Sequence, residues 1–409
     1  MSRRLAAIVD PYTSGVHLAG ALRGLGFDCL GVQSRPSVPE VFRSSFRPED
    51  FGEVLVYGGA LSQTSERLAE RGVEFVIAGC ELGVELADEL CESLGLPGNG
   101  SARRGARRHK GWMAEAFREA GLRVPEQVCS ERLEDVFRWA RDREGPIVVK
   151  PSSSSSSDGV ELCRGEAEIE RAFAAIVGRE NVLGLTNREV VAQEYMSGPE
   201  YVVDTVSRDG RHYPIAFWRY HEPSSSRASL GYEGMELMPG GGVRQERLLE
   251  EARRGLDALE IRIGPGHSEL IWTDEGPVVL EIGARMHGGE NPRLAALSGA
   301  RSHIEDTVRA YADPTSLQDH APAYTLSRHC TVAFLMPRAS GVLRALPRLP
   351  EVEALEALHQ LEIGDCLNLP TSRVIGWVAL VHPEKAVVDR DLAELRRLER
   401  DGLYAIDPA

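Results

Sequence analysis

The 409-residue sequence lacks the features that would direct it to nucleic acids, to membranes or to an oxidising compartment. Its formal charge of −15 leaves little basic surface for nucleic-acid phosphates or anionic lipids. No apolar run approaches the roughly 20 residues that a bilayer-spanning helix needs. The seven cysteines stand singly, without a Cys-x-x-Cys pair, which is typical of reduced, buried thiols. We therefore predict a cytoplasmic enzyme with small-molecule partners, no nucleic acid and no membrane.

The chain also lacks the common glycine-rich phosphate loops. Residues 10–15 follow the first predicted strand but do not form a Gly-x-Gly-x-x-Gly motif, which argues against a dinucleotide site there. This loop is either a helix-capping turn or a substrate contact. Residues 1–100 alternate short apolar runs with helical patterns, which predicts a parallel sheet with helices on its faces. Such sheets bind ligands at the carboxyl ends of their strands.

Two glutamates face each other in a predicted β-hairpin. Its strands span residues 267–273 and 277–283, joined by a three-residue loop that ends in a left-handed Gly276. This register places Glu269 opposite Glu281, with Cβ atoms about 4.5–5.5 Å apart. Apolar neighbours on both faces indicate a buried ladder, where facing carboxylates repel unless a proton or a cation lies between them. Oxygen ligands favour Mg²⁺, whose other ligands are commonly phosphates and water, so the pair points to a nucleotide.

A hydroxyl-rich loop lies between two further predicted strands. Lys150 ends the first strand, residues 152–157 are all serine, and the second strand begins near Val160. Small side chains let backbone N–H groups close around an oxyanion, although serine runs also occur as mobile linkers. Lys110 begins a predicted helix upstream. Two lysines from separate elements would neutralise part of a triphosphate, whereas either lysine alone is typical of a solvated surface charge.

Residues 193–204 leave one predicted strand, turn, and enter another. The exposed backbone of this turn suits an adenine edge, and the carboxylate beyond it suits ribose hydroxyl groups. A plain β-turn is the simpler interpretation of the pattern.

Taken together, these residues resemble those of the ATP-grasp enzymes. Lys110, Lys150 with its serine loop, the Glu-x-x-Ser-Gly-Pro-Glu turn and the paired glutamates followed by Arg285 recur in this order in that superfamily. The turn is similar to that of D-alanine:D-alanine ligase, and the spacing of the glutamates and the arginine is similar to that of biotin carboxylase. The segments 266–269 and 281–289 most resemble the bacterial L-amino-acid (dipeptide) ligases such as bacilysin synthetase. The resemblance spans most of the chain.

The resemblance implies a multidomain α/β and α+β architecture with an ATP-grasp fold. Residues 1–100 would form a Rossmann-like parallel-sheet domain, and residues 101–192 the nucleotide-binding subdomain. Residues 193–324 would form the catalytic, metal-binding subdomain, and residues 325–409 a C-terminal β-rich lid that closes over the substrate.

By the same resemblance, the expected cofactors are ATP and Mg²⁺, with Mn²⁺ as an alternative ion. Arg285 and Lys150 would be catalytic, and Glu269 and Glu281 would hold the ion. Further nucleotide contacts would come from Lys110, Lys150, Ser153, Ser156, Ser157, Gly159, Gln193, Glu194, Met196 and Glu200. Gly283 stands where many relatives have asparagine, so one metal ligand is either missing or replaced by water.

Substrate contacts are expected in two segments. Gly288 and Gly289 precede a predicted helix at residues 292–297, whose N-terminus attracts carboxylates; an ordinary helix start explains the same residues. Residues 219–238 lie where relatives shape the substrate pocket. The candidate substrate-binding residues are His221, Arg227, Tyr232, His287, Gly288, Gly289 and Arg293.

The resemblance implies an ATP-dependent carboxylate–amine ligase of specialised-metabolite biosynthesis. It would join two amino acids or analogues through an acyl phosphate, giving an amide, ADP and phosphate. A homodimer is usual for similar enzymes. Two alternatives are a carboxylase-like enzyme that activates bicarbonate or a non-amino-acid carboxylate, and a nucleotide-sensing module without catalysis.

Overall fold

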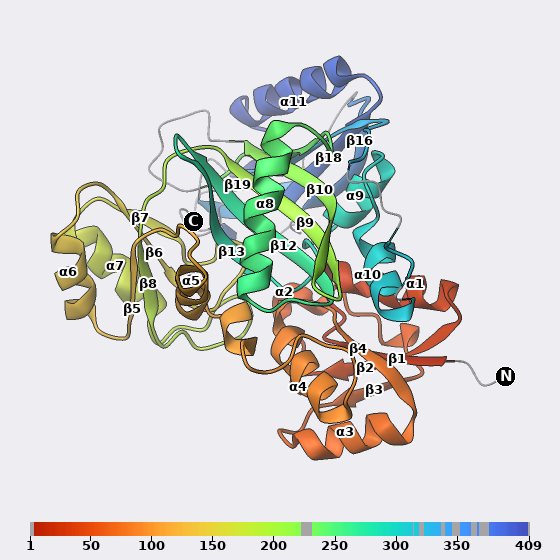
Figure 1. The fold of residues 1–409 in the computed structure, drawn as a ribbon. Helices are drawn as coiled ribbons and strands as arrows, with labels where there is room; N and C mark the ends of the chain where they lie inside the picture. Colours follow the sequence, from red (N-terminus) through yellow and green to blue (C-terminus); the bar gives the residue numbers. More distant parts are fainter. Residues whose placement is uncertain are drawn as a thin grey trace.

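The computed structural model describes residues 4–221, 231–313, 315–318, 323–336, 340–345, 352–360, 366–367 and 376–407. These residues form four sheets with helices packed on their faces (Figure 1). Within the described ranges, no helix has the length and apolar character needed to cross a bilayer.

The N-terminal domain, red to orange in Figure 1, is a four-stranded parallel sheet in the order β3-β2-β1-β4. The alternation of strands and helices predicted for residues 1–100 is confirmed. Because all four strands run the same way, the segments that follow β1 and β4 emerge at one edge of the sheet. The elements are β1 (Arg4–Val9), η1 (Thr13–His17), α1 (Leu18–Gly24), β2 (Phe27–Gln33), α2 (Glu40–Arg43), η2 (Pro48–Asp50), β3 (Glu53–Val56), α3 (Leu61–Glu70), β4 (Val73–Ala78), η3 (Glu81–Gly83) and α4 (Val84–Leu94).

The next unit is a smaller antiparallel sheet in the order β5-β8-β6-β7. Helices α6 and α7 pack on it through an apolar cluster that includes Val136, Ile169 and Val149. The loop between β6 and β7 carries the serine run. The elements are η4 (Arg104–Arg107), α5 (Lys110–Glu119), β5 (Gln127–Ser130), α6 (Leu133–Arg141), β6 (Ile147–Pro151), β7 (Glu161–Cys163), α7 (Glu166–Ile176) and β8 (Val190–Glu194).

An antiparallel sheet in the order β13-β12-β9-β10-β11-β14-β18-β16 forms the centre of the molecule. It crosses the predicted boundary at residues 324–325, so part of the C-terminal segment shares this sheet; the fourfold division of the chain stays a prediction. The elements are β9 (Glu200–Arg208), β10 (Arg211–His221), β11 (Gly234–Met238), α8 (Val243–Ala258), β12 (Gly264–Thr273), β13 (Gly276–Gly283), α9 (Asn291–Leu297), α10 (His303–Ala312), β14 (His329–Leu335), β16 (Leu355–Gln360) and β18 (Gly376–His382).

The remaining described C-terminal residues form a small sheet and a helix. The sheet has the order β17-β15-β19, and the helix lies at the top of Figure 1 in blue. These elements are β15 (Gly341–Ala345), β17 (Cys366–Leu367), α11 (Lys385–Arg400) and β19 (Ala405–Asp407).

Both faces of the large sheet are covered, as the apolar residues of the predicted hairpin indicated. On β9, Tyr201 and Val203 face a core built with α5 and α8. Val202 and Val206 face the opposite core, which α9 and α10 cover. Successive strand residues point to opposite faces, so one strand feeds both cores. The carboxylates on β12 and β13 therefore stand on a ladder with little room to move.

A buried arginine joins three parts of the chain. Arg107 is 0% exposed, and its guanidinium lies 2.6 Å from Asp88 of α4. It also donates to the carbonyl oxygens of Asn99, Gly100 and Leu259 at 2.6, 2.7 and 3.0 Å. Burial raises the pKa of Asp88 to about 6, although the Arg107 charge opposes this rise. The N-terminal domain, the segment at Asn99 and Gly100, and the end of α8 are therefore held together by one side chain.

We expect Arg107→Met to lower the free energy of unfolding by about 3–5 kcal/mol, because it leaves the buried Asp88 without its partner. Arg103→Met is the matched control, since Arg103 pairs with Glu119 at the surface and surface pairs contribute about 0–1 kcal/mol. The measurement is urea unfolding of both variants followed by circular dichroism. Equal losses in the two variants would contradict the structural role of Arg107.

Candidate active site

The two predicted metal-binding glutamates face each other across β12 and β13. Glu269 pairs with Glu281, which confirms the predicted opposition. The details of the predicted hairpin were wrong at two positions, the turn and a β-bulge, and the two errors cancel. Thr273 pairs with Gly276 around a two-residue turn, and a β-bulge between Glu269 and Leu270 then shifts the register by one. Bulges redirect side chains, and this one restores the pairing that the shorter turn would have broken.

Two lysines from the predicted nucleotide-binding unit converge on these glutamates. Lys110 Nζ lies 3.0 Å from Glu281 Oε2 and donates to the carbonyl of Ser154 at 3.0 Å. Lys150 donates to Gln193 Oε1 at 3.1 Å. Burial lowers the pKa of Lys150, while the nearby charges of Glu281 and Glu269 oppose the shift. The sequence places these lysines 40 residues apart, and the fold brings both to one cluster of carboxylates.

The carboxylates in this cluster respond differently to burial. Burial raises the pKa of Glu200 well above its ordinary value, and the charges of Glu269 and Glu281 raise it further. Burial also acts on Glu269, but a hydrogen bond and positive charge from His267, with Arg285 and Lys110, outweigh it and lower its pKa to about 2. Crowding of acidic groups therefore leaves Glu269 ionised and favours a proton on Glu200.

Glu200 accepts a hydrogen bond from the Tyr232 hydroxyl, and Tyr232 stacks on Tyr220 with ring centroids 4.4 Å apart. The predicted nucleotide-binding residue Glu200 and the predicted substrate residue Tyr232 thus meet. His221, the next residue after Tyr220, lies beside the charges of Glu236 and Arg396 instead. Alternation along β10 explains the difference, because Tyr220 and His221 point to opposite faces.

The serine loop is anchored at its base. Lys110 N donates to the carbonyl of Ser152 at 2.9 Å, and Asn181 donates to the carbonyl of Ser153 at 3.0 Å. Ser156 and Ser157 at the tip are exposed and have left-handed φ values of 58° and 55°. Gly159 is exposed and shares a positive φ of 67°. The loop therefore has a fixed base next to Lys110 and a tip that is bent without burying its hydroxyl groups.

The turn after β8 lies beside a small apolar cluster. Gln193 bridges Lys150 and Gln127, donating to Gln127 Oε1 at 2.8 Å. The Glu194 N–H is already bonded to the carbonyl of Glu126 at 2.8 Å, so this N–H is not available to a ligand. Met196 packs with Ile271, Val278 and Leu280. An apolar wall beside exposed backbone groups suits the flat face and polar edge of a purine.

A buried chain of hydrogen-bonded polar residues contacts Glu269, and no sequence pattern predicted it. Asp204 accepts from His267 Nδ1 at 2.8 Å and from His287 Nδ1 at 3.0 Å. The other ring nitrogen of His267 lies 3.3 Å from Glu269 Oε1. The hydrogen bonds and charges of both histidines lower the pKa of Asp204 although burial opposes them. The predicted substrate residue His287 therefore belongs to this support and also contacts Asn291 at 2.8 Å.

Arg285 meets a residue of the N-terminal domain that sequence reasoning missed. Its Nε donates to Glu81 Oε2 at 3.1 Å, and its Nη1 donates to the carbonyl of Met286 at 3.0 Å. Arg108 lies 3.7 Å from the same Glu81 carboxylate. Glu81 follows β4 at the carboxyl edge of the parallel sheet, where ligand-binding residues gather. The only sequence signal for this role was an acidic residue directly after a predicted parallel strand.

The two glycines after Arg285 lie against the loop after β1. Gly289 N donates to Thr13 Oγ1 at 2.8 Å, and Thr13 has a left-handed φ of 50°. The loop at residues 10–15 thus contacts the Gly288–Gly289 turn. The alternative interpretation of this loop was a helix-capping turn; Tyr12, the N-cap residue of η1, makes no side-chain capping hydrogen bond.

Two other predicted substrate residues are placed differently. Arg293 of α9 is paired with Glu290 at 2.7 Å and with Glu356 at 3.3 Å. Its charge is therefore already balanced by two carboxylates. Arg227 lies outside the described residues.

The donor set fits a hard divalent cation. Glu269 and Glu281 offer two opposed carboxylates whose side chains are 23% and 24% exposed. Their mutual repulsion on a fixed ladder is relieved by an ion between them, and carboxylate oxygens are the ligands that Mg²⁺ prefers.

Comparison with known proteins agrees with this geometry. Residues 108–289 match the family model described as an ATP-grasp domain. Dapdiamide A synthase of Enterobacter agglomerans is 27% identical, over 98% of this chain and 97% of that protein. Alanine–anticapsin ligase of Bacillus subtilis (strain 168) is 25% identical, over 75% of this chain and 68% of that protein.

Among solved structures, the L-amino acid ligase from Bacillus licheniformis superposes with a TM-score of 0.77 at 17% identity, covering 100% of both chains. The likeness of the folds confirms the predicted mixed α/β architecture. The residues that converge on Glu269 and Glu281 lie within the matched segment or, in the case of Glu81, contact it. Residues 108–289 therefore match an ATP-grasp domain, and the chain as a whole is similar to dapdiamide A synthase and to the L-amino-acid ligases.

Proposed function

We propose that the protein joins the carboxylate of one amino acid to the amine of a second through an acyl phosphate. One observation carries the proposal: Lys110, Lys150 and Arg285 surround the opposed pair Glu269 and Glu281. Such an arrangement suits the transfer of a phosphoryl group, whose catalysis depends on positioning and on charge stabilisation.

In the first step, a carboxylate oxygen of the donor forms a bond to the γ-phosphorus, and the bond from that phosphorus to ADP breaks. Lys110 and Lys150, beside the two glutamates, would stabilise the phosphate charge. Mg²⁺ held by Glu269 and Glu281 would supply further charge stabilisation. In the second step, the amine attacks the acyl carbon, phosphate leaves, and the amine loses a proton. Arg285, planar and permanently charged, suits the oxygens that carry negative charge in both steps.

The pairing of Arg285 with Glu81 favours an amino acid over other carboxylates. An amino acid carries a carboxylate and an ammonium group, and the two side chains present the complementary charges side by side. Bicarbonate and simple carboxylates have no cation for Glu81 to bind. The carboxylase-like alternative therefore offers this half-buried acidic residue no substrate group to bind, whereas an amino-acid substrate does.

The serine loop would exclude water from the acyl phosphate. Its base is bonded to Lys110, so contact of Lys110 with phosphate and closure of the tip would be mechanically linked. The Tyr232–Glu200 pair would bind the ribose. With a proton on Glu200, this pair offers hydroxyl donors as well as acceptors to the sugar.

The proposal is tested by incubating the full chain with ATP, Mg²⁺ and pooled amino acids. We expect phosphate release that depends on amino acids, together with a product whose mass equals two amino acids less one water. Bicarbonate in place of the amino acids is the control for the carboxylase-like alternative. Phosphate release that follows bicarbonate and ignores amino acids would contradict the proposal, and so would an absence of turnover with every pair.

We expect Arg285→Ala to lower kcat by about 10²–10³-fold, the cost of removing one positioned donor to a developing negative charge. Arg309→Ala is the control, because Arg309 pairs with Glu305 and Asp306 on α10 away from this cluster. Steady-state phosphate release provides the measurement, with circular dichroism to verify folding. Near-normal turnover in the folded Arg285→Ala variant would remove Arg285 from the mechanism.

We expect Glu81→Gln to raise KM for the carboxyl-donating amino acid by about 10-fold or more, since a charge-assisted hydrogen bond contributes about 1.5–3 kcal/mol. The KM for ATP should stay within about twofold. Glu85→Gln is the matched control, because Glu85 also lies near Arg108, at 3.6 Å, but is 42% exposed. In the wild-type protein, an analogue of the donor without its amino group should have a higher KM than the amino acid itself. In Glu81→Gln this difference in KM should disappear. Undiminished discrimination against that analogue would argue against ammonium binding by Glu81.

A further inference from the structure

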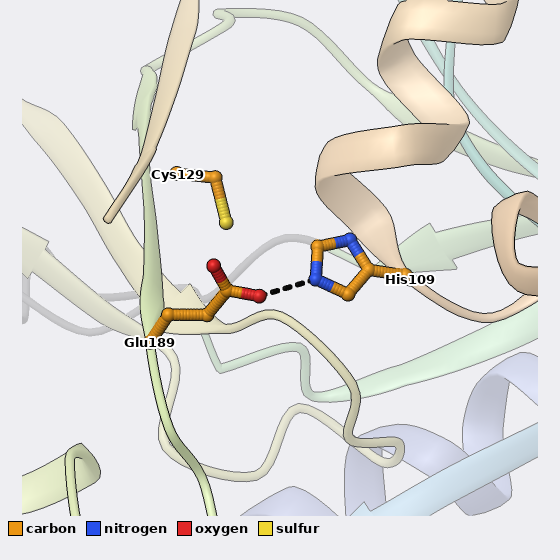
Figure 2. A group of neighbouring side chains, drawn as sticks. All are labelled: His109, Cys129 and Glu189. Atoms are coloured by element: carbon orange, nitrogen blue, oxygen red, sulfur yellow. Dashed lines mark hydrogen bonds and ion pairs between the residues drawn. The ribbon is translucent and has the colours of Figure 1, made fainter. Parts of the chain in front are cut away.

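A second cluster of polar side chains lies beside Lys110 but outside the proposed active site. It consists of His109, Cys129 and Glu189, and Figure 2 shows the three side chains converging from separate elements. One ligand atom of each residue lies within 4.8 Å of the others. None of the three has a role in the ligation mechanism.

Local packing brings these side chains together. Cys129 lies on the edge strand β5 and pairs with Val191, so Glu189, two residues before Val191, is its diagonal neighbour across the strands. His109 is the N-cap residue of α5. Gly111 permits the close approach, because a Cβ there would lie 3.2 Å from Cys129 Cβ and 3.3 Å from its sulfur.

Hydrogen bonds from His109 and Cys129 to Glu189 join the three side chains. His109 Nδ1 accepts from the N–H of Trp112 at 3.2 Å, so the ring proton is on Nε2, which donates to Glu189. The Cys129 thiol also bonds to the Glu189 carboxylate; burial and this contact raise the pKa of the thiol. Despite burial, the hydrogen bonds from His109 and Cys129 lower the pKa of Glu189. Two donors thus point at one carboxylate, and an ion bound by all three groups would take the place of both donated hydrogens.

We propose that His109, Cys129 and Glu189 form a binding site for Zn²⁺ or a similar borderline-soft divalent cation. A thiolate, an imidazole nitrogen and a carboxylate oxygen are ligands of Zn²⁺, bound at about 2.0–2.3 Å, with water in the fourth position. Ligand atoms on one tetrahedral ion lie about 3–4 Å apart, so shifts of about 1 Å complete the geometry. The Glu189 side chain is 28% exposed, which gives an ion access from solvent.

Occupation of this site would act on the active site through the helix cap. Zn²⁺ needs the lone pair of His109 Nε2, so the ring proton moves to Nδ1 and opposes the N–H of Trp112. The cap of α5 is then lost immediately before Lys110. The Cys129 thiol proton leaves to solvent, since only the thiolate binds the ion. Zinc binding therefore disturbs the lysine that contacts Glu281 and the serine loop.

The site is tested by titrating the full chain with Zn²⁺ at saturating Mg²⁺ and measuring bound metal by equilibrium dialysis. We expect one equivalent of Zn²⁺, and Cys129→Ser should weaken this binding by more than about 100-fold, the upper figure for loss of an outer-shell partner. His109→Asn is the second variant, because asparagine keeps an N-cap acceptor and removes the nitrogen ligand. Cys163→Ser, on β7 of the same sheet, is the matched control.

A spectroscopic titration checks which atoms bind. Co²⁺ in place of Zn²⁺ should give a thiolate-to-cobalt charge-transfer band that Cys129→Ser removes and Cys163→Ser retains. Trp112 is 60% exposed and stacks on His109 with ring centroids 4.2 Å apart, so its fluorescence should change on zinc binding. Absence of bound Zn²⁺, or binding that Cys129→Ser and His109→Asn leave unchanged, would overturn the proposal.

The coupling to Lys110 has its own readout and rests on the proposed function. Zn²⁺ should raise the KM for ATP in the wild-type protein and leave it unchanged in Cys129→Ser. Zinc binding without any change in KM would overturn the coupling through the helix cap. Failure of the wild-type protein to turn over ATP with any amino acid would instead contradict the proposed function, while the dialysis result would still decide whether the zinc site exists.

Discussion

The repulsion between Glu269 and Glu281 is the constraint on which the site depends. Both residues stand on a ladder buried from two sides, and their register is fixed by the turn and by the bulge. Their paired backbones cannot separate, so the surrounding chain supplies positive charge or accepts a proton. Lys110, His267 and Arg285 supply the charge, and Glu200 takes the proton. The positions of the other site residues follow from this requirement.

This requirement also links the folding units. Lys110 and Lys150 come from the predicted nucleotide-binding unit, and Glu81, which balances Arg285, follows the last strand of the N-terminal sheet. In each unit alone, these charges would lack their partners while remaining partly shielded from water. An unpaired charge costs more free energy the more it is buried. The same charges that stabilise phosphate in the proposed reaction therefore favour the assembled arrangement of the units.

The sequence predicted what depends on local pattern and failed where distant segments meet. The parallel N-terminal sheet, the two lysines and the opposed glutamates were predicted from periodicity and from the resemblance. Glu81 was missed because 204 residues separate it from Arg285, and neither residue carries a local signal of the other. The orientation of strand residues is a further limit. Tyr220 stacks on Tyr232 and the neighbouring His221 faces the other way. Only the register of β10 against its neighbours decides which of the two faces the cluster; His221 stays a predicted substrate residue.

The start of α5 carries two side chains with different chemical preferences. Lys110 points to the oxygen ligands of Glu269 and Glu281, where the hard ion Mg²⁺ is favoured. His109, one residue earlier, points to a sulfur and a carboxylate, a set that favours Zn²⁺. Because the two sites differ in ligand softness, a large excess of Mg²⁺ does not fill the second site. Because both sites share this helix end, zinc bound at His109 would change the position of Lys110 and thereby weaken ATP binding at the Mg²⁺ site.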